Sequence, residues 1–282
     1  MTLRQAQGPS GAYRAAVKRS NGGVRALYSG NATAVLGRGL LATRSTNWVI
    51  VLTGVFEPMF YLLSLGVGLG SLIGTVQDSS GNDIPYKAFI APALLAVSAM
   101  NGAIYDSTWN VFFKMHFGKL YQGMLATRLG PLDVALGEIA LALLRGAVYG
   151  VAFMLVMQVL GLNLSWTAIF ALPTLVIIAF GFASLGMGIT SYLKSFQQMD
   201  WIPIVLLPMF LLSSTFFPIT VYPEVAQWFI KALPLWHGIE LVRGFTTGVL
   251  SWAMVGHFAY FGVMIAGGLF FTTRRLRALF LD

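Results

Sequence analysis

Long apolar segments, separated by short polar connections, make up most of this chain of 282 residues. Six of the apolar segments reach the roughly 17–25 residues that a helix needs to cross the hydrocarbon core of a bilayer. The pattern therefore predicts an all-α integral membrane protein with six membrane-spanning helices. We place these spans near residues 47–72, 88–112, 132–160, 167–190, 201–221 and 251–272.

The region between the last two spans is apolar but too interrupted to cross a membrane. Prolines and glycines, including Pro223, Pro234 and Gly248, divide residues 222–248 into pieces of about ten residues, or about 15 Å of helix each. A hydrocarbon core is about 30 Å thick. We expect a re-entrant hairpin here, which is two short helices, broken at Pro234, that enter the outer face and return.

The N-terminal part of the chain differs from the rest. Its first 30 or so residues are rich in Gln, Gly, Ser and basic residues and contain no apolar run, which is typical of a disordered tail. Four apolar residues then follow at near-helical spacing, with basic residues on other faces: Val35, Leu36, Leu40 and Leu41. This pattern favours a helix in the membrane interface, and a frayed start to the first span is the alternative. We therefore expect a tail with an interfacial helix over 1–46 and one transmembrane domain over 47–282.

Composition and charge support this topology. The chain is 57% hydrophobic and 10% charged, whereas soluble domains carry about a quarter charged residues. Its formal net charge of +8 does not indicate nucleic-acid binding, because the basic residues lie at the ends and in short connections. Fourteen Lys and Arg residues lie on one side of the predicted spans and three on the other, Lys87, Lys231 and Arg243. Positive loops stay inside, so we expect a multi-pass protein of the cell membrane with both termini cytoplasmic.

Four charged residues lie well inside the predicted spans, away from the span ends: Glu57, Asp106, Glu138 and Arg145. At 1.5 Å per residue, Glu57 and Arg145 both lie roughly 15–20 Å from the cytoplasmic boundary and can pair, whereas Asp106 and Glu138 share a level about 9 Å in. Charges in hydrocarbon are costly and usually find partners. The set either lines a pathway or gate, or holds the spans together.

The connection between the second and third spans carries an apolar stripe. Its members recur at i, i+4, i+7 and i+11: Phe113, Phe117, Leu120 and Met124. This spacing predicts a surface helix with one apolar face. Such a face can dock in a groove of a soluble partner or rest on the lipid surface.

The sequence lacks the residues for nucleotide hydrolysis or metal chemistry. It has no Gly-x-x-x-x-Gly-Lys-Ser/Thr loop, and its only Gly-Lys pair, Gly118-Lys119, is followed by Leu. It has no cysteine, and His116, His237 and His257 show no ligand spacing. We therefore expect no enzyme active site, metal or cofactor on this chain.

Several stretches carry a family likeness. They are Tyr86-Lys-Ala-Phe-Ile-Ala-Pro-Ala-Leu-Leu-Ala, Ser98-Ala-Met-Asn-Gly-Ala, Ser107-Thr-Trp-Asn-Val-Phe-Phe-Lys-Met, and Leu132-Asp-Val-Ala-Leu-Gly-Glu followed by Arg145-Gly. They resemble the ABC-2 type permease family, most closely its branch of nodulation, lipo-chitooligosaccharide exporters. Ser213–Pro218 and Leu233–Gly244 also resemble this family, in which they form outer helices that close the exit of the pathway. The resemblance implies an outer gate made of Phe216, Phe217, Pro218, Pro234 and the i, i+3 pair Glu240 and Arg243.

The resemblance implies the permease subunit of an ABC exporter for an amphiphilic substrate, such as a lipid-linked oligosaccharide, a glycolipid or a lipophilic drug. ATP and Mg²⁺ would bind two separate ATPase subunits, and a second permease copy or a paralogue would complete the pathway. In this family the connection after the second span receives the motion of the ATPase, so the stripe that starts at Phe113 would form the coupling helix. The alternative from another class is a proton-coupled secondary transporter with Glu57, Asp106 and Glu138 as its relay.

Overall fold

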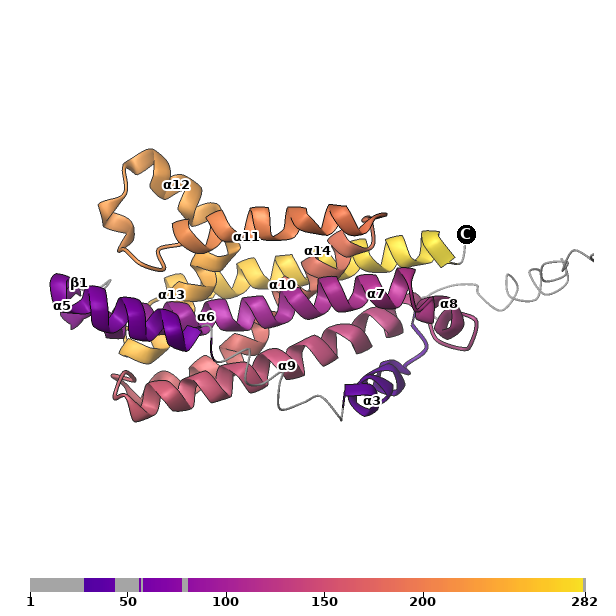
Figure 1. Cartoon of the computed structure of the whole chain (residues 1–282), viewed down its shortest axis with the longest axis horizontal. Coiled ribbons are helices and arrows are strands. Elements are labelled where there is room, and N and C mark those ends of the chain that lie inside the picture. The colour runs from indigo at the N-terminus through magenta and orange to yellow at the C-terminus, as the bar shows by residue number, and fades with distance from the viewer. Residues whose placement is uncertain (1–27, 44–55, 57, 78–80, 281–282) are drawn as a thin grey trace, which may run out of the picture.

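The computed structural model describes residues 28–43, 56, 58–77 and 81–280. Regular structure within them is helical except for one hairpin, in which strands β1 (Thr75–Gln77) and β2 (Asp83–Pro85) pair antiparallel. The long helices run side by side along the long axis of the molecule (Figure 1). Strand β1 lies at one end of this bundle and α8 (Leu120–Leu125) at the other, and we call these the β1 end and the α8 end.

Four helices of the described residues are long and apolar enough to cross a membrane. The first comprises α6 (Tyr86–Tyr105), the π-helix η2 (Asp106–Asn110) and α7 (Val111–His116). The others are α9 (Pro131–Val159), η3 with α10 (Trp166–Phe170 and Ala171–Thr190), and α14 (Ala253–Phe280). They correspond to the spans predicted near 88–112, 132–160, 167–190 and 251–272. The first continues to His116 and therefore ends later than predicted.

The span predicted near 47–72 lies partly outside the described residues. Its described part is an apolar helix over Pro58–Ile73, which includes the π-helix η1 (Leu62–Leu69) and α5 (Gly70–Ile73). The count of six spans therefore stays a prediction.

The helix predicted over 201–221 begins and ends earlier in the structure. It consists of the 3-10 helix η4 (Phe196–Asp200) and α11 (Trp201–Leu212), which together are about 28 Å long at about 2.0 Å per residue in the 3-10 turn and 1.5 Å in the α-helix. The helix ends because the Ser213 hydroxyl bonds back to the Met209 carbonyl and Ser214 adopts a left-handed backbone with φ 59°. The predicted bounds are wrong because the apolar sequence continues after the backbone has left the helix.

Two short helices occupy the region predicted as a re-entrant hairpin. After η5 (Ile219–Val221) come α12 (Glu224–Ala232) and α13 (Pro234–Thr247), and Pro234 is the first residue of α13. Proline fits this position because the first turn of a helix needs no backbone donor. The placement of this pair relative to a membrane stays a prediction.

Helix α6 is the centre of the bundle. It is buried along nearly its whole length, whereas α14 is mostly exposed. It packs against α9, α10 and α13, and small residues permit this close approach. A Cβ atom on Gly102 of α6, for example, would lie 2.9 Å from the Tyr149 ring of α9. Because α6 is fixed on several sides, it positions the charged residues that follow it.

The N-terminal helix α3 (Ala32–Thr43) packs beside the first half of α9 (Figure 1). Gly137 of α9 leaves room for this contact, because a Cβ atom there would lie 2.5 Å from Val35 Cβ and 2.9 Å from the Ala32 carbonyl oxygen. The helix predicted around Val35 to Leu41 is thus present and covers Ala32–Thr43. Its location in a membrane interface is not described by the structure.

Asp133 connects the start of α9 to the residues that precede α3. Its carboxylate accepts hydrogen bonds from the backbone N–H groups of Ser29 at 2.7 Å, Asn31 at 2.9 Å and Gly130 at 2.8 Å. It also accepts one from the Ser29 hydroxyl at 2.8 Å. One buried carboxylate therefore caps α9 and anchors α3.

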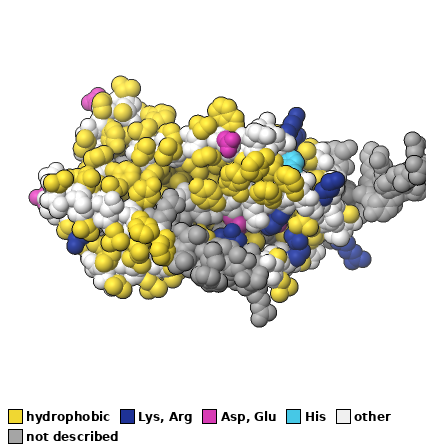
Figure 2. Space-filling view, viewed as in Figure 1, with side chains coloured by type: hydrophobic (Ala, Val, Ile, Leu, Met, Phe, Trp, Pro, Cys, Tyr) yellow, Lys and Arg dark blue, Asp and Glu magenta, His cyan; other side chains and the backbone are white. Residues whose placement is uncertain are grey.

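The two ends of the bundle differ in charge. Hydrophobic side chains cover most of the face seen in Figure 2, and most of the Lys and Arg side chains on that face lie toward the α8 end. Helix α14 ends in this region as well, and its last turns carry Arg274, Arg275 and Arg277.

We expect Gly137→Ala to lower the stability of the protein by about 1–3 kcal/mol, because the added methyl group overpacks the contact with α3. The matched control is Gly262→Ala on α14, where nothing lies within 4 Å of the added atom. That change should be neutral or slightly stabilising, since alanine favours helix. Thermal unfolding in detergent micelles measures both, and equal melting temperatures for the two variants would contradict the α3–α9 contact.

Candidate functional site

Two ion pairs join the α6–α7 helix to α9. Arg145 Nη1 lies 2.8 Å from Asp106 Oδ1, and Lys114 Nζ lies 2.5 Å from Glu138 Oε2. Both carboxylates are nearly inaccessible, at 2% and 4% side-chain exposure, whereas Arg145 and Lys114 retain 22% and 15%. Each buried acid is therefore neutralised by a base whose other side reaches the surface.

The two pairs form at once because a π turn adjusts the spacing. Asp106 and Lys114 are eight residues apart, whereas their partners Arg145 and Glu138 are seven apart, close to two turns of an α-helix. Eight residues overshoot two α turns, but η2 begins at Asp106 and a π turn holds nearly one residue more than an α turn. Both charges of the first helix consequently face α9. Asn110, also in η2, donates a hydrogen bond of 2.9 Å to Asp106 Oδ1.

These pairs revise two predictions made from the sequence. Arg145 pairs with Asp106, and Glu57, the partner proposed for it, lies outside the described residues. Asp106 and Glu138 also do not share one depth, because Asp106 lies opposite Arg145, about 10 Å along α9 from Glu138 at 1.5 Å per residue. The depth was misjudged because the helix that carries Asp106 continues to His116.

The predicted coupling stripe is divided between two helices. Helix α7 ends at His116, Lys119 adopts a left-handed backbone with φ 48°, and α8 begins at Leu120. The single surface helix predicted here is therefore wrong, because the chain turns between the second and third members of the stripe.

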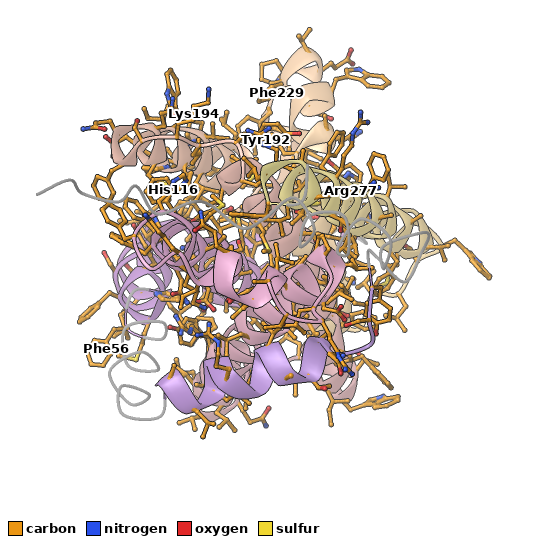
Figure 3. All side chains as sticks on the ribbon, turned by 90° about the vertical axis from the view of Figure 1, so that its right-hand side faces the viewer. Phe56, His116, Tyr192, Lys194, Phe229 and Arg277 are labelled. Atoms are coloured by element: carbon orange, nitrogen blue, oxygen red, sulfur yellow. The ribbon has the colours of Figure 1, made fainter. Side chains whose placement is uncertain are left out.

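The four residues of the stripe accordingly face different surroundings. Phe113 and Phe117 are 45% and 67% exposed, with ring centroids 5.3 Å apart. Phe196 of η4 lies 5.9 Å from Phe113 and extends this aromatic surface. Leu120 and Met124 are instead partly buried against the core. Figure 3 views this end of the molecule, where His116 of α7 and Lys194 lie near one another, and His116 Nε2 is 3.0 Å from the Leu193 carbonyl oxygen.

Tyr121 is a buried member of this region that the stripe did not include. With Leu125 it forms the inward face of α8, at 0% and 8% exposure. Its hydroxyl has no hydrogen-bond partner among the residues that the structure describes. Burial raises the pKa of Tyr121 well above its usual value, and the charge of Glu138 raises it further. The i, i+4 spacing of Tyr121 and Leu125 is the only sequence signal that could have identified it.

At the β1 end, Arg243 holds the turn that follows α11. It is 5% exposed, pairs with Glu240 at 2.7 Å and donates to the Ser214 carbonyl oxygen at 3.0 Å. Its guanidinium lies 4.0 Å from the centroid of the Phe89 ring. The sequence predicted the pair with Glu240, and the structure adds that Arg243 is buried and that it connects α13 to α6.

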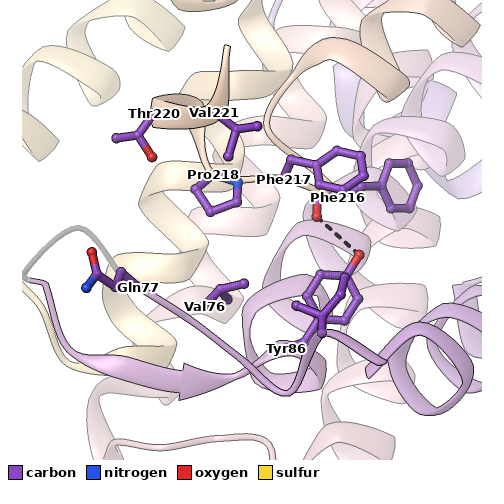
Figure 4. Close-up of a pocket in the computed structure, with 9 residues that line it drawn as sticks. Val76, Gln77, Tyr86, Phe216, Phe217, Pro218, Thr220 and Val221 are labelled. Atoms are coloured by element: carbon purple, nitrogen blue, oxygen red, sulfur yellow. Dashed lines mark hydrogen bonds between the residues drawn. The ribbon is translucent and has the colours of Figure 1, made fainter. Parts of the chain in front are cut away.

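A cavity of about 430 Å³ lies beside this turn. Its lining is mostly apolar and comes from Ile73 of α5, from strand β1, from Tyr86 and from the segment after α11 (Figure 4). Three predicted gate residues, Phe216, Phe217 and Pro218, line it. The Tyr86 hydroxyl donates a hydrogen bond of 3.1 Å to the Phe216 carbonyl oxygen and so fixes one wall.

The structure brings two of the three histidines together. His237 Nδ1 of α13 lies 2.6 Å from His257 Nδ1 of α14, although the sequence spacing did not predict this contact. Two ligands do not make a metal site, and the described residues contain no group of three or more His, Cys, Asp or Glu that could hold an ion.

Comparisons with known proteins agree in pointing to one family. A family model described as ABC-2 type transporter matches residues 31–247. Nodulation protein J of Sinorhizobium fredii is 34% identical over 76% of this chain and 80% of that protein. The protein of the same name from Rhizobium leguminosarum bv. viciae is 33% identical over 78% of this chain and 85% of that protein. For Rhizobium meliloti the identity is 30%, over 77% and 82% respectively.

We expect Arg145→Ala to destabilise the protein by about 3–5 kcal/mol, because it leaves the carboxylate of Asp106 buried without its cation. Changing both residues to leucine should cost less, since no charge is then stranded. Denaturant unfolding of Arg145→Leu, Asp106→Leu and the double leucine variant measures the coupling between the residues. Arg274→Ala, an exposed arginine of α14, serves as the control and should stay within about 0.5 kcal/mol of the parent. Additive effects of the two changes would show that the pair does not form.

Proposed function

Because this chain belongs to the ABC-2 type transporter family, we propose that it is the permease subunit of an exporter that moves an amphiphilic substrate across the cytoplasmic membrane. A separate ATPase subunit, present in two copies, would supply the energy and would bind the ATP and Mg²⁺. Three findings support this proposal: the family match over 31–247, four apolar helices of membrane-spanning length, and a sequence without a phosphate-binding Gly-Lys-Ser/Thr loop.

The observation that carries the coupling proposal is the exposed aromatic surface at the α8 end. Phe117 is 67% exposed and lies at the turn between α7 and α8. An aromatic side chain in that position can anchor a helix in a groove of a partner protein. Here the partner is the ATPase, and Phe113 and Phe196 belong to the same surface.

The ion pairs supply a route from this surface into the bundle. Lys114 lies one turn before Phe117 and bonds to Glu138 of α9. Motion of the turn at Phe117 would therefore act first on the Lys114–Glu138 pair. The deeper pair, Asp106 with Arg145, lies two turns further along the same helices. We propose that these four charged residues relay the ATPase cycle to the packing of α6–α7 against α9.

The orientation follows from the distribution of charge. Lys and Arg residues gather toward the α8 end in Figure 2, and this end would face the cytoplasm under the positive-inside rule. Both termini would then be cytoplasmic. The β1 end, with α12, α13 and the apolar cavity, would lie at the outer face. There Arg243 and Tyr86 would hold the gate segment, by which we mean residues Ser214–Pro218.

The substrate class rests on the relatives and on the outer cavity. The likeness to nodulation exporters favours a lipid-linked oligosaccharide, a glycolipid or a lipophilic drug as the cargo. An apolar cavity of about 430 Å³ beside the gate segment suits the hydrophobic part of such a molecule.

We further propose that a second copy of this permease or a paralogue completes the pathway. The exposed apolar residues of α11, among them Ile204 and Leu207, suit such packing.

We do not favour the proton-coupled alternative. Asp106 and Glu138 each form an ion pair with a basic residue of the neighbouring helix, at 2.8 Å and 2.5 Å, and this pairing accounts for both buried residues without a relay.

Phe117→Ser should leave membrane insertion intact and lower the affinity of the permease for the ATPase. Loss of an anchor of this kind costs about 2 kcal/mol or more, which is roughly thirtyfold in affinity. Recovery of the ATPase with the tagged permease and ATP-dependent export from inverted vesicles measure the effect. Phe229→Ser, which changes an aromatic residue of α12 that is 59% exposed, is the matched control and should behave as the parent. Full recovery of the ATPase by the Phe117 variant would refute the docking proposal.

The proposed topology predicts which sites can be labelled from outside the cell. The chain has no cysteine, so single cysteines at Glu224, Ser251 and Leu279 can be introduced without further changes. A membrane-impermeant thiol reagent added to intact cells should label the first two sites, which flank α12 and α13, and should not label Leu279 near the C-terminus. Labelling at Leu279 would show that the α8 end is not cytoplasmic.

A further inference from the structure

We propose that the Tyr121 hydroxyl is a second hydrogen-bond donor for Glu138, which replaces Lys114 when α8 moves. Tyr121 would thus be a positioning residue of the transport cycle. The movement of α8 that starts this exchange rests on the proposed function, because we assume that an ATPase displaces α8. The exchange itself concerns three residues of this chain and can be tested without transport.

The first argument is the isolation of a buried polar atom. The Tyr121 side chain is fully buried, and its hydroxyl has no hydrogen-bond partner among the described residues. A buried hydroxyl without a partner destabilises the state in which it occurs. A phenylalanine would fill the same space with its ring and would bury no polar atom. The hydroxyl is therefore accounted for if it gains a partner in another state of the protein.

The second argument is the identity of the nearby acceptor. Helix α8 packs against α9, the helix that carries Glu138, and Glu138 is the charged residue with the largest influence on the pKa of Tyr121. Lys114 bonds to Oε2 of Glu138, and a carboxylate has two oxygens that can each accept several bonds. We therefore assign Glu138 as the acceptor. If Lys114 withdraws, the Tyr121 hydroxyl can donate to it and keep the carboxylate partnered.

The third argument is the position of the two donors on the chain. Lys114 lies in the last turn of α7 and Tyr121 in the first turn of α8, on either side of the turn at Lys119. Rotation of α8 about this turn would change the position of one donor relative to the other. Lys114 already reaches the surface, so it can regain water as it leaves. The exchange transfers no proton, because a neutral hydroxyl takes the place of an ammonium group as the donor.

The test is a double-mutant cycle on thermal stability, in detergent micelles and with the whole chain. In the parent, Tyr121→Phe should leave the melting temperature unchanged or raise it, because the hydroxyl has no bond to lose. In the Lys114→Met background, Tyr121→Phe should lower it by a further amount of about 2–4 °C, since the hydroxyl is then the donor to Glu138. Equal shifts in the two backgrounds would overturn the proposal. If Lys114→Met accumulates too poorly to melt, the recovered folded protein is compared instead, and equal recovery with Tyr121 and with phenylalanine would have the same meaning.

The control is Tyr192→Phe, which removes the hydroxyl of a tyrosine near the α8 end that is 51% exposed. Its effect should be the same in both backgrounds. A second readout is ATP-dependent export, which Tyr121→Phe should slow about fivefold while ATPase binding stays unchanged; export at the parental rate would overturn the role in the cycle. Should the parent itself export nothing, the proposed function fails, and the stability cycle still decides whether Tyr121 and Glu138 interact.

Discussion

A carboxylate inside an apolar helix bundle needs a cation or several donors within reach, and this requirement organises the protein. Asp106 and Glu138 are almost completely buried, and each bonds to a base on the neighbouring helix. Apolar side chains alone set the register of membrane helices weakly, since lipid solvates them as well as protein does. Sliding α6–α7 by one turn, about 5.4 Å, would break both pairs together. The charges therefore specify how the central helix lies against α9, and the π-helix η2 is the local distortion that allows both pairs to form.

Helix α9 contacts both the N-terminal segment and the helix that leads to the α8 end. Within its first half, Asp133 and Gly137 contact the N-terminal segment and α3, whereas Glu138 and Arg145 bind the helix that leads to α8. Two structures that are distant in sequence thus meet on one helix. A change in the position of α9 would therefore affect the positions of α3 and α7 alike.

Hydropathy predicted the four long helices, since their apolar runs are longer than any soluble core requires. It failed where the backbone has the deciding role. The end of α11 depends on the left-handed Ser214, and the division of the coupling stripe depends on the left-handed Lys119. The partner of Arg145 depends on the π turn at Asp106, which no hydrophobic pattern records. Tyr121 was missed because its only sequence signal is the i, i+4 spacing with Leu125, which the stripe that starts at Phe113 obscures, and burial is what makes its hydroxyl informative.

The bonds made by Asp133 also constrain the order in which the protein can be assembled. Ser29 and Asp133 are 104 residues apart, and ribosomes add about 5–20 residues per second. The N-terminal helix is therefore complete several seconds before the residue that anchors it has been synthesised. During biosynthesis α3 must remain without its final contacts, and it can take its place only after the following two apolar segments have been made and α9 has begun to emerge.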